Sequence, residues 1–205
     1  RDVERSRGLG DVYKRQPTNI VDIATGTGDV AISMAKKIPT SQIVGIDLSE
    51  EMLKVAQQKI EHFSIKPNIR LLCEDAENLS LSSNTFDVVT ISFGIRNFEN
   101  IVKGLSECHR ILKEGGSLFI MEFSTPKHKV FNVLYRIYSK HILPLIGQVI
   151  SNDDKAYKYL PESIVEFNRE HEFTELLLNN GFDSCISISL SNGIAHIYIG
   201  VKSKM

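Results

Sequence analysis

The chain of 205 residues is 42% hydrophobic and 24% charged, a composition typical of a globular protein that buries one substantial core. Its formal net charge is −1, and acidic and basic residues are interspersed, so no positive field would attract nucleic acid as the principal partner. The three cysteines are widely separated and lack the spacing of a zinc site, and we expect no bound metal.

Residues 1–16 differ from the rest of the chain. They lack an initiating Met, apolar residues at helical spacing and a clear strand before Pro17. We interpret this segment as non-native or disordered sequence joined to a protein whose own beginning is missing. The expected domain therefore spans residues 17–205.

From Asn19 onward, short apolar runs alternate with helical patterns. Alternation at this spacing predicts right-handed βαβ units around a parallel sheet. The expected strands are Ile20–Ala24, Gln42–Asp47, Ile69–Glu74, Phe86–Ser92 and Ser117–Phe123, and the expected helices are Asp29–Ile38, a helix from the cap Ser49 to about His62, and Asn100–Leu112, which ends before Gly115-Gly116.

The last part of the chain has a different pattern. A helix near Glu170–Asn179 is followed by two apolar runs, Phe182–Leu190 and Ile194–Val201. Asn-Gly lies in the short connection between them, and this dipeptide between apolar runs is a strong hairpin signal. We therefore expect a doubly wound, Rossmann-like α/β fold with a mostly parallel seven-stranded sheet that ends in an antiparallel hairpin.

A glycine turn follows the first expected strand, where Val21–Asp29 reads Val-Asp-Ile-Ala-Thr-Gly-Thr-Gly-Asp. Gly26 and Gly28 would let the backbone approach a ligand closely, and the start of the next helix adds free N–H donors. With Ala31 the turn also satisfies the dinucleotide fingerprint, so an NAD enzyme stays open, as does a tight turn without a ligand.

Acidic and hydroxyl side chains follow the next three strands. Asp47 ends the second strand, where an acid can accept hydrogen bonds from both ribose hydroxyls of a nucleoside cofactor. Asp75-Ala76 follows the third strand, the position where methyltransferases commonly hold the adenine amino group. Ser92 ends the fourth strand, beside the expected methionine end of such a cofactor. The alternative for Asp75 is a loop acid that caps a turn.

Several longer blocks give a more specific resemblance. Thr90–Asn97 reads Thr-Ile-Ser-Phe-Gly-Ile-Arg-Asn, and Met121–Pro126 reads Met-Glu-Phe-Ser-Thr-Pro. These blocks, with Arg110–Gly116, Tyr157–Ile164 and Gly193–His196, resemble the ubiquinone/menaquinone biosynthesis C-methyltransferases (UbiE/MenG family). The resemblance covers roughly Ile20–Val201 and departs from the family at Glu114, where Pro is usual, and in 1–16, which lacks a Tyr-Asp-x-x-Asn motif.

The resemblance implies a class I methyltransferase fold, S-adenosylmethionine as cofactor and C-methylation of a lipid quinol ring in menaquinone or ubiquinone biosynthesis. Demethylmenaquinol is the favoured substrate. The cofactor contacts that the resemblance implies are Thr27, Asp47, Asp75, Ala76 and Ser92, which join Gly26 and Gly28 of the turn.

Methylation of a ring carbon requires an electron-rich ring, which ionisation of the neighbouring hydroxyl provides. A phenol with the pKa of Tyr, ~10, needs ~4 kcal/mol to ionise at pH 7. A positive group held close to it can supply much of that free energy. Arg96 is the candidate catalytic residue for this task, directly or through a water, and Asn97 is the candidate for orienting the ring oxygen. The alternative for Arg96 is a structural salt bridge, and the reserve candidates are Asp153, Asp154 and Tyr157.

Residues 127–165 are expected to form a helical lid. Apolar residues recur there at helical spacing, and Lys127, Lys129, Arg136 and Lys140 add positive charge. This basic amphipathic pattern favours contact with an apolar substrate or an anionic membrane, and a packed insertion is the alternative. Because no apolar run reaches the ~18 residues that span a bilayer, we expect a soluble or peripheral protein. The pattern of three widely separated cysteines fits a reducing cytosol, so we expect a cytoplasmic protein in contact with the inner face of the membrane. A homodimer remains open.

Three alternatives to a quinol methyltransferase remain. The first is a methyltransferase for another small apolar acceptor, such as a sterol or a fatty acyl chain. The second is an NAD(P)-dependent oxidoreductase, which would share Gly26, Gly28 and Asp47 but would leave the hairpin and Arg96-Asn97 unexplained. The third is a chain that binds the cofactor without activity.

Overall fold

The computed structural model describes residues 17–63, 68–124 and 173–203. Segment 1–16 and the expected lid at 127–165 lie outside the described residues. The strands are β1 (Asn19–Ile23), β2 (Gln42–Asp47), β3 (Ile69–Cys73), β4 (Phe86–Ser92), β5 (Leu112–Phe123), β6 (Phe182–Leu190) and β7 (Ala195–Lys202). The helices are α2 (Asp29–Lys37), α3 (Glu50–His62), α4 (Ile101–Ile111) and α8 (Phe173–Asn179), with short 3-10 helices η1 (Ile95–Asn97) and η3 (Ser191–Gly193).

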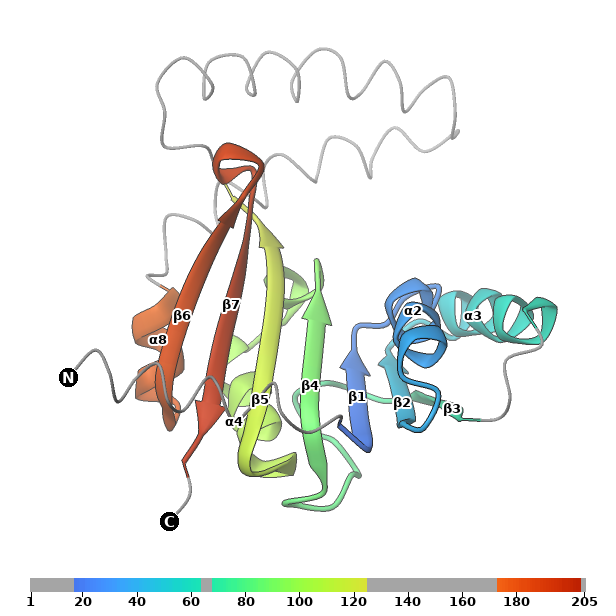
Figure 1. Ribbon diagram of the computed structural model, residues 1–205, viewed down its shortest axis with the longest axis horizontal. Coiled ribbons are helices and arrows are strands. Elements are labelled where there is room, and N and C mark those ends of the chain that lie inside the picture. Colours follow the sequence, from blue (N-terminus) through green and yellow to red (C-terminus); the bar gives the residue numbers. More distant parts are fainter. Residues whose placement is uncertain (1–16, 64–67, 125–172, 204–205) are drawn as a thin grey trace.

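The described strands form one sheet in the order β3-β2-β1-β4-β5-β7-β6 (Figure 1). Strands β1 to β5 pair in parallel, whereas β7 pairs antiparallel with both β5 and β6. The predicted parallel sheet with a C-terminal antiparallel hairpin is confirmed. Successive strands run outward from β1 on one side and from β4 on the other, and ligands of such sheets bind beyond the carboxyl ends at this point of reversal.

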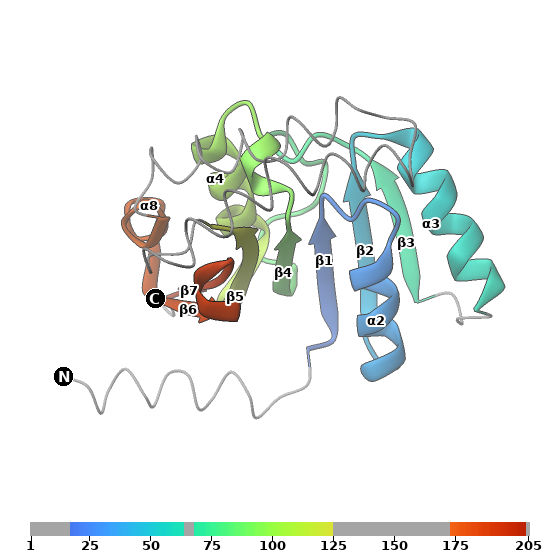
Figure 2. The ribbon, with the colours of Figure 1, turned by 90° about the horizontal axis from the view of Figure 1, so that it is seen from above.

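Helices pack on both faces of the sheet (Figure 2). On one face α2 buries Ala31 and Ala35 against Ile20 and Ile43 of β1 and β2. On the other face α4 and α8 contribute to the larger core, which includes the fully buried Leu105 and, on β5, Ile120 and Leu118. Burying aliphatic side chains of this size stabilises the fold by roughly 1.5–3 kcal/mol each.

Two helices begin at the carboxyl edge of the sheet with side-chain caps. The Ser49 hydroxyl accepts a hydrogen bond from the Met52 N–H at 3.2 Å, as the sequence predicts for the start of α3. Asn100 caps α4 in the same way, because its Oδ1 accepts from the Lys103 N–H at 3.1 Å. Each cap satisfies a donor that the first helical turn leaves unpaired.

The fifth strand begins earlier than the sequence predicts, at Leu112 instead of Ser117. Leu112 pairs with Phe86 and Ser117 pairs with Val88, so the residues between them bulge out of the ladder. Gly115 has φ +76°, which a β-carbon disfavours. The two glycines therefore allow a bulge within the strand instead of marking its start.

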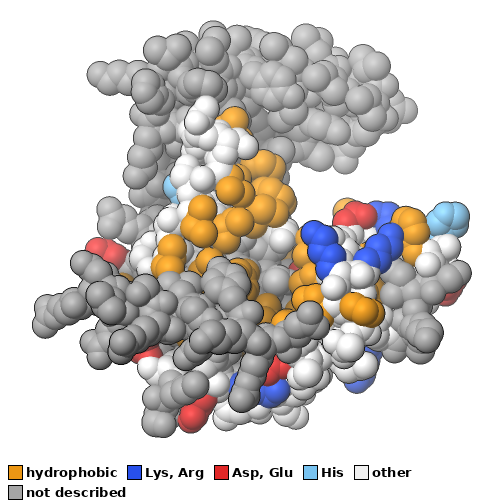
Figure 3. Space-filling view, in the orientation of Figure 1, with side chains coloured by type: hydrophobic (Ala, Val, Ile, Leu, Met, Phe, Trp, Pro, Cys, Tyr) orange, Lys and Arg blue, Asp and Glu red, His pale blue; other side chains and the backbone are white. Residues whose placement is uncertain are grey.

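The face of the sheet opposite α4 and α8 carries apolar side chains from its C-terminal half. Phe119 and Met121 of β5 pair with Ile199 and Ile197 of β7, so these side chains share one face. Figure 3 shows hydrophobic side chains gathered on this side of the molecule. Within the described residues, no helix is long and apolar enough to cross a membrane, and no group of three or more His, Cys, Asp or Glu could hold a metal.

Candidate functional site

The turn after β1 is built from residues with positive φ. Ala24, Gly26 and Gly28 have φ of 54°, 56° and 78°. A β-carbon on Gly26 would meet no heavy atom within 4 Å, whereas one on Gly28 would lie 3.0 Å from Cβ of Ala56 in α3. Gly26 thus leaves its backbone open to a ligand, and Gly28 lets the start of α2 pack against α3.

Asp47 joins this turn to the end of β2. Its Oδ2 accepts a hydrogen bond from the Gly26 N–H at 2.8 Å, and its Oδ1 accepts from the Ser49 N–H at 2.9 Å. A carboxylate has about four lone-pair sites, so each oxygen can accept one more hydrogen bond. The carboxylate is therefore held in place by backbone donors while it still has acceptor capacity for a pair of ligand hydroxyls.

The other predicted cofactor contacts lie around these two turns. The Thr27 hydroxyl accepts from Lys59 Nζ at 2.8 Å and donates to Asp29, so surface charges hold it. Asp75 is exposed after β3, and its Oδ1 accepts from the Glu77 N–H at 2.9 Å. This bond makes Asp75 a turn cap, and its exposed position leaves it accessible to a ligand. Ala76 is buried beside it.

Asp22 is a buried acid of β1 that the sequence did not single out. Its oxygens accept hydrogen bonds from the hydroxyls of Thr25 and Thr90, each at 2.6 Å. Burial raises the pKa of Asp22 to about 6; the two hydroxyls act in the opposite direction, and Asp47 adds to the rise. The available signal was an acid inside the apolar run Ile20–Ala24.

The end of β4 approaches the end of β1. Ser92 is half-buried at the last position of β4, and Phe93 after it has φ 59°, which is uncommon for a bulky residue. A β-carbon on Gly94 would lie 2.3 Å from Cβ of Ala24, so only glycine fits there. Strained residues at the ends of two neighbouring strands are typical of ligand sites.

Arg96 lies in η1, directly beyond β4, and forms an ion pair with Glu122 of β5. Its Nη1 lies 2.6 Å from Glu122 Oε1 and also donates to the Phe93 carbonyl at 2.6 Å. The side chains are 10% and 1% exposed, so little water screens the pair. The geometry agrees with the salt-bridge alternative for Arg96, and it places the guanidinium at the carboxyl edge of the sheet.

Aromatic rings lie beside this ion pair. Phe93 and Phe123 stack with ring centroids 4.2 Å apart, and Arg96 Cζ lies 5.8 Å from the centroid of Phe123. Asn97 is exposed, and its N–H donates to the Gly94 carbonyl at 3.0 Å. Among the described residues, this region therefore combines apolar rings with the Arg96–Glu122 ion pair, which suits an aromatic ligand that carries polar substituents.

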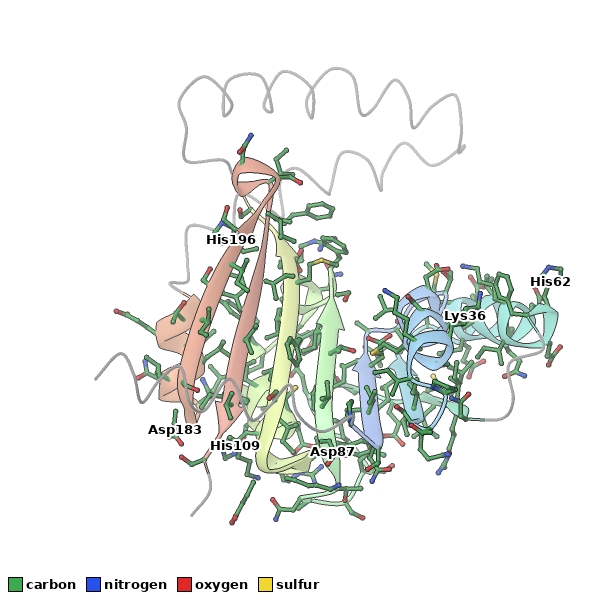
Figure 4. The ribbon with its side chains drawn as sticks, viewed as in Figure 1. Lys36, His62, Asp87, His109, Asp183 and His196 are labelled. Carbon is green, nitrogen blue, oxygen red and sulfur yellow. The ribbon has the colours of Figure 1, made fainter. Side chains whose placement is uncertain are left out.

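Polar residues of β7 extend the site from Glu122. His196 is its pairing partner across the β5–β7 ladder, and His196 Nδ1 lies 3.0 Å from the Ser187 hydroxyl. Burial raises the pKa of Tyr198, and the negative charge of Glu122 adds to the rise. Figure 4 shows His196 toward the end of the sheet where the parallel strands have their carboxyl ends, whereas Asp87 and His109 lie toward the opposite end.

The structure brings the predicted cofactor residues together at the carboxyl ends of the parallel strands and places Arg96 and Asn97 next to them. Glu122 was not predicted, although an acid between Met121 and Phe123 in an apolar strand was an available signal. The reserve candidates Asp153, Asp154 and Tyr157 lie outside the described residues.

Comparisons with known proteins agree with this arrangement. The model of the ubiE/COQ5 methyltransferase family matches residues 8–202. A demethylmenaquinone methyltransferase from Porphyromonas gingivalis is 38% identical over 201 residues, which cover 98% of this chain and 82% of that protein. The ubiquinone/menaquinone biosynthesis C-methyltransferase UbiE of Geotalea uraniireducens is 42% identical over 184 residues, 89% of this chain and 78% of that protein.

Solved structures share the fold at lower identity. A SAM-dependent methyltransferase from Aquifex aeolicus has a TM-score of 0.67 at 16% identity and covers 97% of this chain and 89% of its own. Phosphoethanolamine N-methyltransferase 2 of Haemonchus contortus, solved with S-adenosyl-L-methionine, has a TM-score of 0.68 at 16% identity, with 98% of this chain and 53% of its own covered.

Proposed function

The chain belongs to the ubiE/COQ5 methyltransferase family, and from this premise we propose that it transfers the methyl group of S-adenosylmethionine to a ring carbon of a demethylmenaquinol. Relatives at 38% and 41% identity are named demethylmenaquinone methyltransferases, which favours a naphthoquinol over a benzoquinol acceptor. Family membership also favours this function over the NAD(P)-dependent alternative.

The residues at the carboxyl edge fit S-adenosylmethionine. The open side of Gly26 gives a ligand access to the backbone, and Asp47 is oriented by two N–H donors with acceptor capacity left for ribose hydroxyls. Asp75 and Ala76 would contact the adenine, and Thr27, Gly28 and Ser92 complete the set of expected contacts. The cofactor supplies a sulfonium whose methyl group is open to attack by a nucleophile.

The chain's own residues would prepare the acceptor. Arg96 would stabilise the negative charge that develops on the ring oxygen, and Asn97 would orient that oxygen. The stacked rings of Phe93 and Phe123 beside Arg96 support contact with a planar naphthoquinol. Because the site lies at the sheet edge where β1 and β4 end, the acceptor ring would meet the methyl group beside Ser92.

We also propose a cytoplasmic protein in peripheral contact with the membrane that holds its lipid substrate. The basic amphipathic stretch at 127–150 supports this, although it lies outside the described residues.

Calorimetry with S-adenosylhomocysteine and NADH tests the cofactor. We expect S-adenosylhomocysteine to bind and Asp47→Ala to weaken it by roughly 2–4 kcal/mol, because charge-assisted hydrogen bonds to both ribose hydroxyls are lost. Glu61→Ala, which removes an exposed acid at the far end of α3, is the matched control and should bind as the unsubstituted chain does. Unchanged affinity in Asp47→Ala would remove Asp47 from the site, and tighter binding of NADH would contradict the methyltransferase function.

A further inference from the structure

Two buried atoms of the Arg96–Glu122 pair have no hydrogen-bond partner among the described residues. They are Arg96 Nε and Glu122 Oε2. The other two such atoms among the described residues belong to Asn68, directly before β3, and to Ser117, within β5 where it pairs with Val88. Buried polar atoms of native proteins nearly always have a partner, so an unpaired donor and an unpaired acceptor on one ion pair indicate a ligand or water that completes them.

Glu122 has the properties of a proton acceptor. Its Oε1 accepts from Arg96 and from the Phe123 N–H at 2.8 Å, which fixes the carboxylate and leaves Oε2 available. Burial raises the pKa of Glu122 above its ordinary value, although Arg96 acts in the opposite direction. Within the part of the chain that the structure describes, Tyr198 and His196 of β7 are the other titratable groups that face it.

The charge balance gives Glu122 a role in the reaction of the proposed function. The guanidinium and the carboxylate together are neutral, so while Glu122 stays ionised it opposes the stabilisation that Arg96 gives to a phenolate. Once Glu122 carries a proton, the positive charge of Arg96 has no internal partner and can pair with an anionic ring oxygen. A ring hydroxyl beside the pair can be the source of that proton.

Resting on the proposed function, we propose that Glu122 is the general base that takes the proton of the quinol hydroxyl, and that the resulting phenolate replaces it as the partner of Arg96. The ring O–H bond breaks, its electron pair stays on oxygen, and a new O–H bond forms on Glu122. An electron pair of the phenolate ring forms the new bond to the methyl carbon while the bond from that carbon to sulfur breaks and leaves its pair on sulfur. The ring carbon's own hydrogen then leaves to water as a proton, and its bonding pair restores the aromatic ring and the negative charge on the ring oxygen. Glu122 then returns its proton to the ring oxygen, so one proton is released overall.

The pH dependence of kcat tests the proposal in a Glu122→Gln variant, which keeps the shape of the side chain. The assay uses a short-tailed demethylmenaquinol kept reduced under anaerobic conditions. In the unsubstituted chain the proton moves within the site, so kcat should be flat from neutral to alkaline pH. In Glu122→Gln only quinol that has already ionised reacts, so kcat should be roughly 100-fold lower or more at pH 7 and should rise about tenfold per pH unit.

Two further variants separate the base from a structural role. Glu122→Asp keeps a carboxylate and should keep the flat profile at a lower rate. Glu107→Gln alters another Glu–Arg pair, at 2.7 Å on α4, and should leave the shape of the profile unchanged. Calorimetry with S-adenosylhomocysteine shows for each variant that the fold and the cofactor site are intact.

Infrared difference spectra give a readout without turnover. A naphthol that cannot be oxidised, made more acidic by ring chlorines, is added with S-adenosylhomocysteine. The C=O stretch of a protonated carboxylic acid should appear in the unsubstituted chain and not in Glu122→Gln. If the pH profiles of kcat for the unsubstituted chain and Glu122→Gln are parallel, or if the unsubstituted chain shows no such band, the proposal that Glu122 is the base is wrong. Either result would leave the proposed function intact. No methyl transfer by the unsubstituted chain would contradict the proposed function as well.

Discussion

Asp22 is a carboxyl group whose surroundings favour its protonated form. Its pKa is about 6 in the folded protein against an ordinary value of 3.8. Between these values the folded state binds more protons than the unfolded state, so the free energy of unfolding falls as pH rises through this window. The loss is complete above pH ~6 and amounts to about 3 kcal/mol, since the side chain is almost fully buried.

Asp22→Asn removes this titration and keeps the shape of the side chain. Its Oδ1 can accept from one threonine hydroxyl as before, whereas its Nδ2 must donate to the other, which a hydroxyl can accept. The free energy of unfolding of the variant minus that of the unsubstituted chain should therefore increase by up to about 3 kcal/mol as the pH rises from 4 to 7. Urea unfolding at several pH values measures the difference, in which the other titrating groups cancel. A difference that does not change with pH would show that Asp22 titrates normally.

Substitution can separate the ion pair of Arg96 with Glu122 from the chemical role that we propose for Arg96. Arg96→Met should lower kcat by roughly 10²–10³, comparable to removing one oxyanion-hole donor. It should also destabilise the fold by roughly 3–5 kcal/mol, because Glu122 is left buried with an uncompensated charge.

In the double variant Arg96→Met/Glu122→Gln neither charge of this pair remains buried, so thermal stability should largely return while methyl transfer stays slow. Thermal unfolding and single-turnover assays measure the two effects. Recovery of activity together with stability would show that both Arg96 and Glu122 serve the fold alone. Arg96→Lys should rescue poorly, since an ammonium could replace Nη1 in its contacts with Phe93 and Glu122 but offers no counterpart of the planar guanidinium's Nε, which has no partner among the described residues.

At the scale of elements, local signals predicted most of the fold. Short apolar runs located β2, β4 and β6 at their observed bounds, and Ser49 marked the start of α3. These signals lie within a few residues of each other in the chain. The start of β5 was missed because its glycines sit in a bulge, whose position depends on pairing with β4 and not on local sequence.

For the site, too, local signals were predictable and contacts between distant strands were not. The glycine turn and Asp47 were predictable, because parallel strands bring their carboxyl ends to one edge. The Arg96–Glu122 pair joins residues 26 positions apart, and the buried contacts of Asp22 join β1 to Thr90 of β4. Such partners depend on the register between strands, which the sequence pattern does not specify.

The amphipathic stretch at 127–150 can be tested as an element, although it lies outside the described residues. Reversing Lys129, Arg136 and Lys140 to Glu should reduce sedimentation with anionic vesicles, since each basic residue near such a surface contributes ~1 kcal/mol. Circular dichroism serves as the control for folding. Equal sedimentation of both proteins would leave a packed insertion as the role of this stretch.

At the scale of the whole molecule, the topology separates binding from stability. Chain order reverses between β1 and β4, so the residues that we propose to contact the cofactor, together with Arg96, lie at the carboxyl ends of the strands. The amino ends carry structural bonds instead, such as those from the N–H groups of Thr18 and Asn19 to Asp87. The hairpin of β6 and β7 completes the sheet and supplies His196 and Tyr198 beside Glu122.

Transfer of a labelled methyl group tests the proposed function most directly. The chain is incubated under anaerobic conditions with a reduced short-tailed demethylmenaquinol and S-adenosylmethionine that carries a deuterated methyl group. Mass spectrometry and NMR of the extracted quinone then locate the label. We predict one deuterated methyl group on the ring carbon next to the prenyl-bearing carbon, formed together with an equal amount of S-adenosylhomocysteine. A label on a ring oxygen, or no label in the quinone from a chain that binds S-adenosylhomocysteine, would contradict C-methylation of a quinol by this protein.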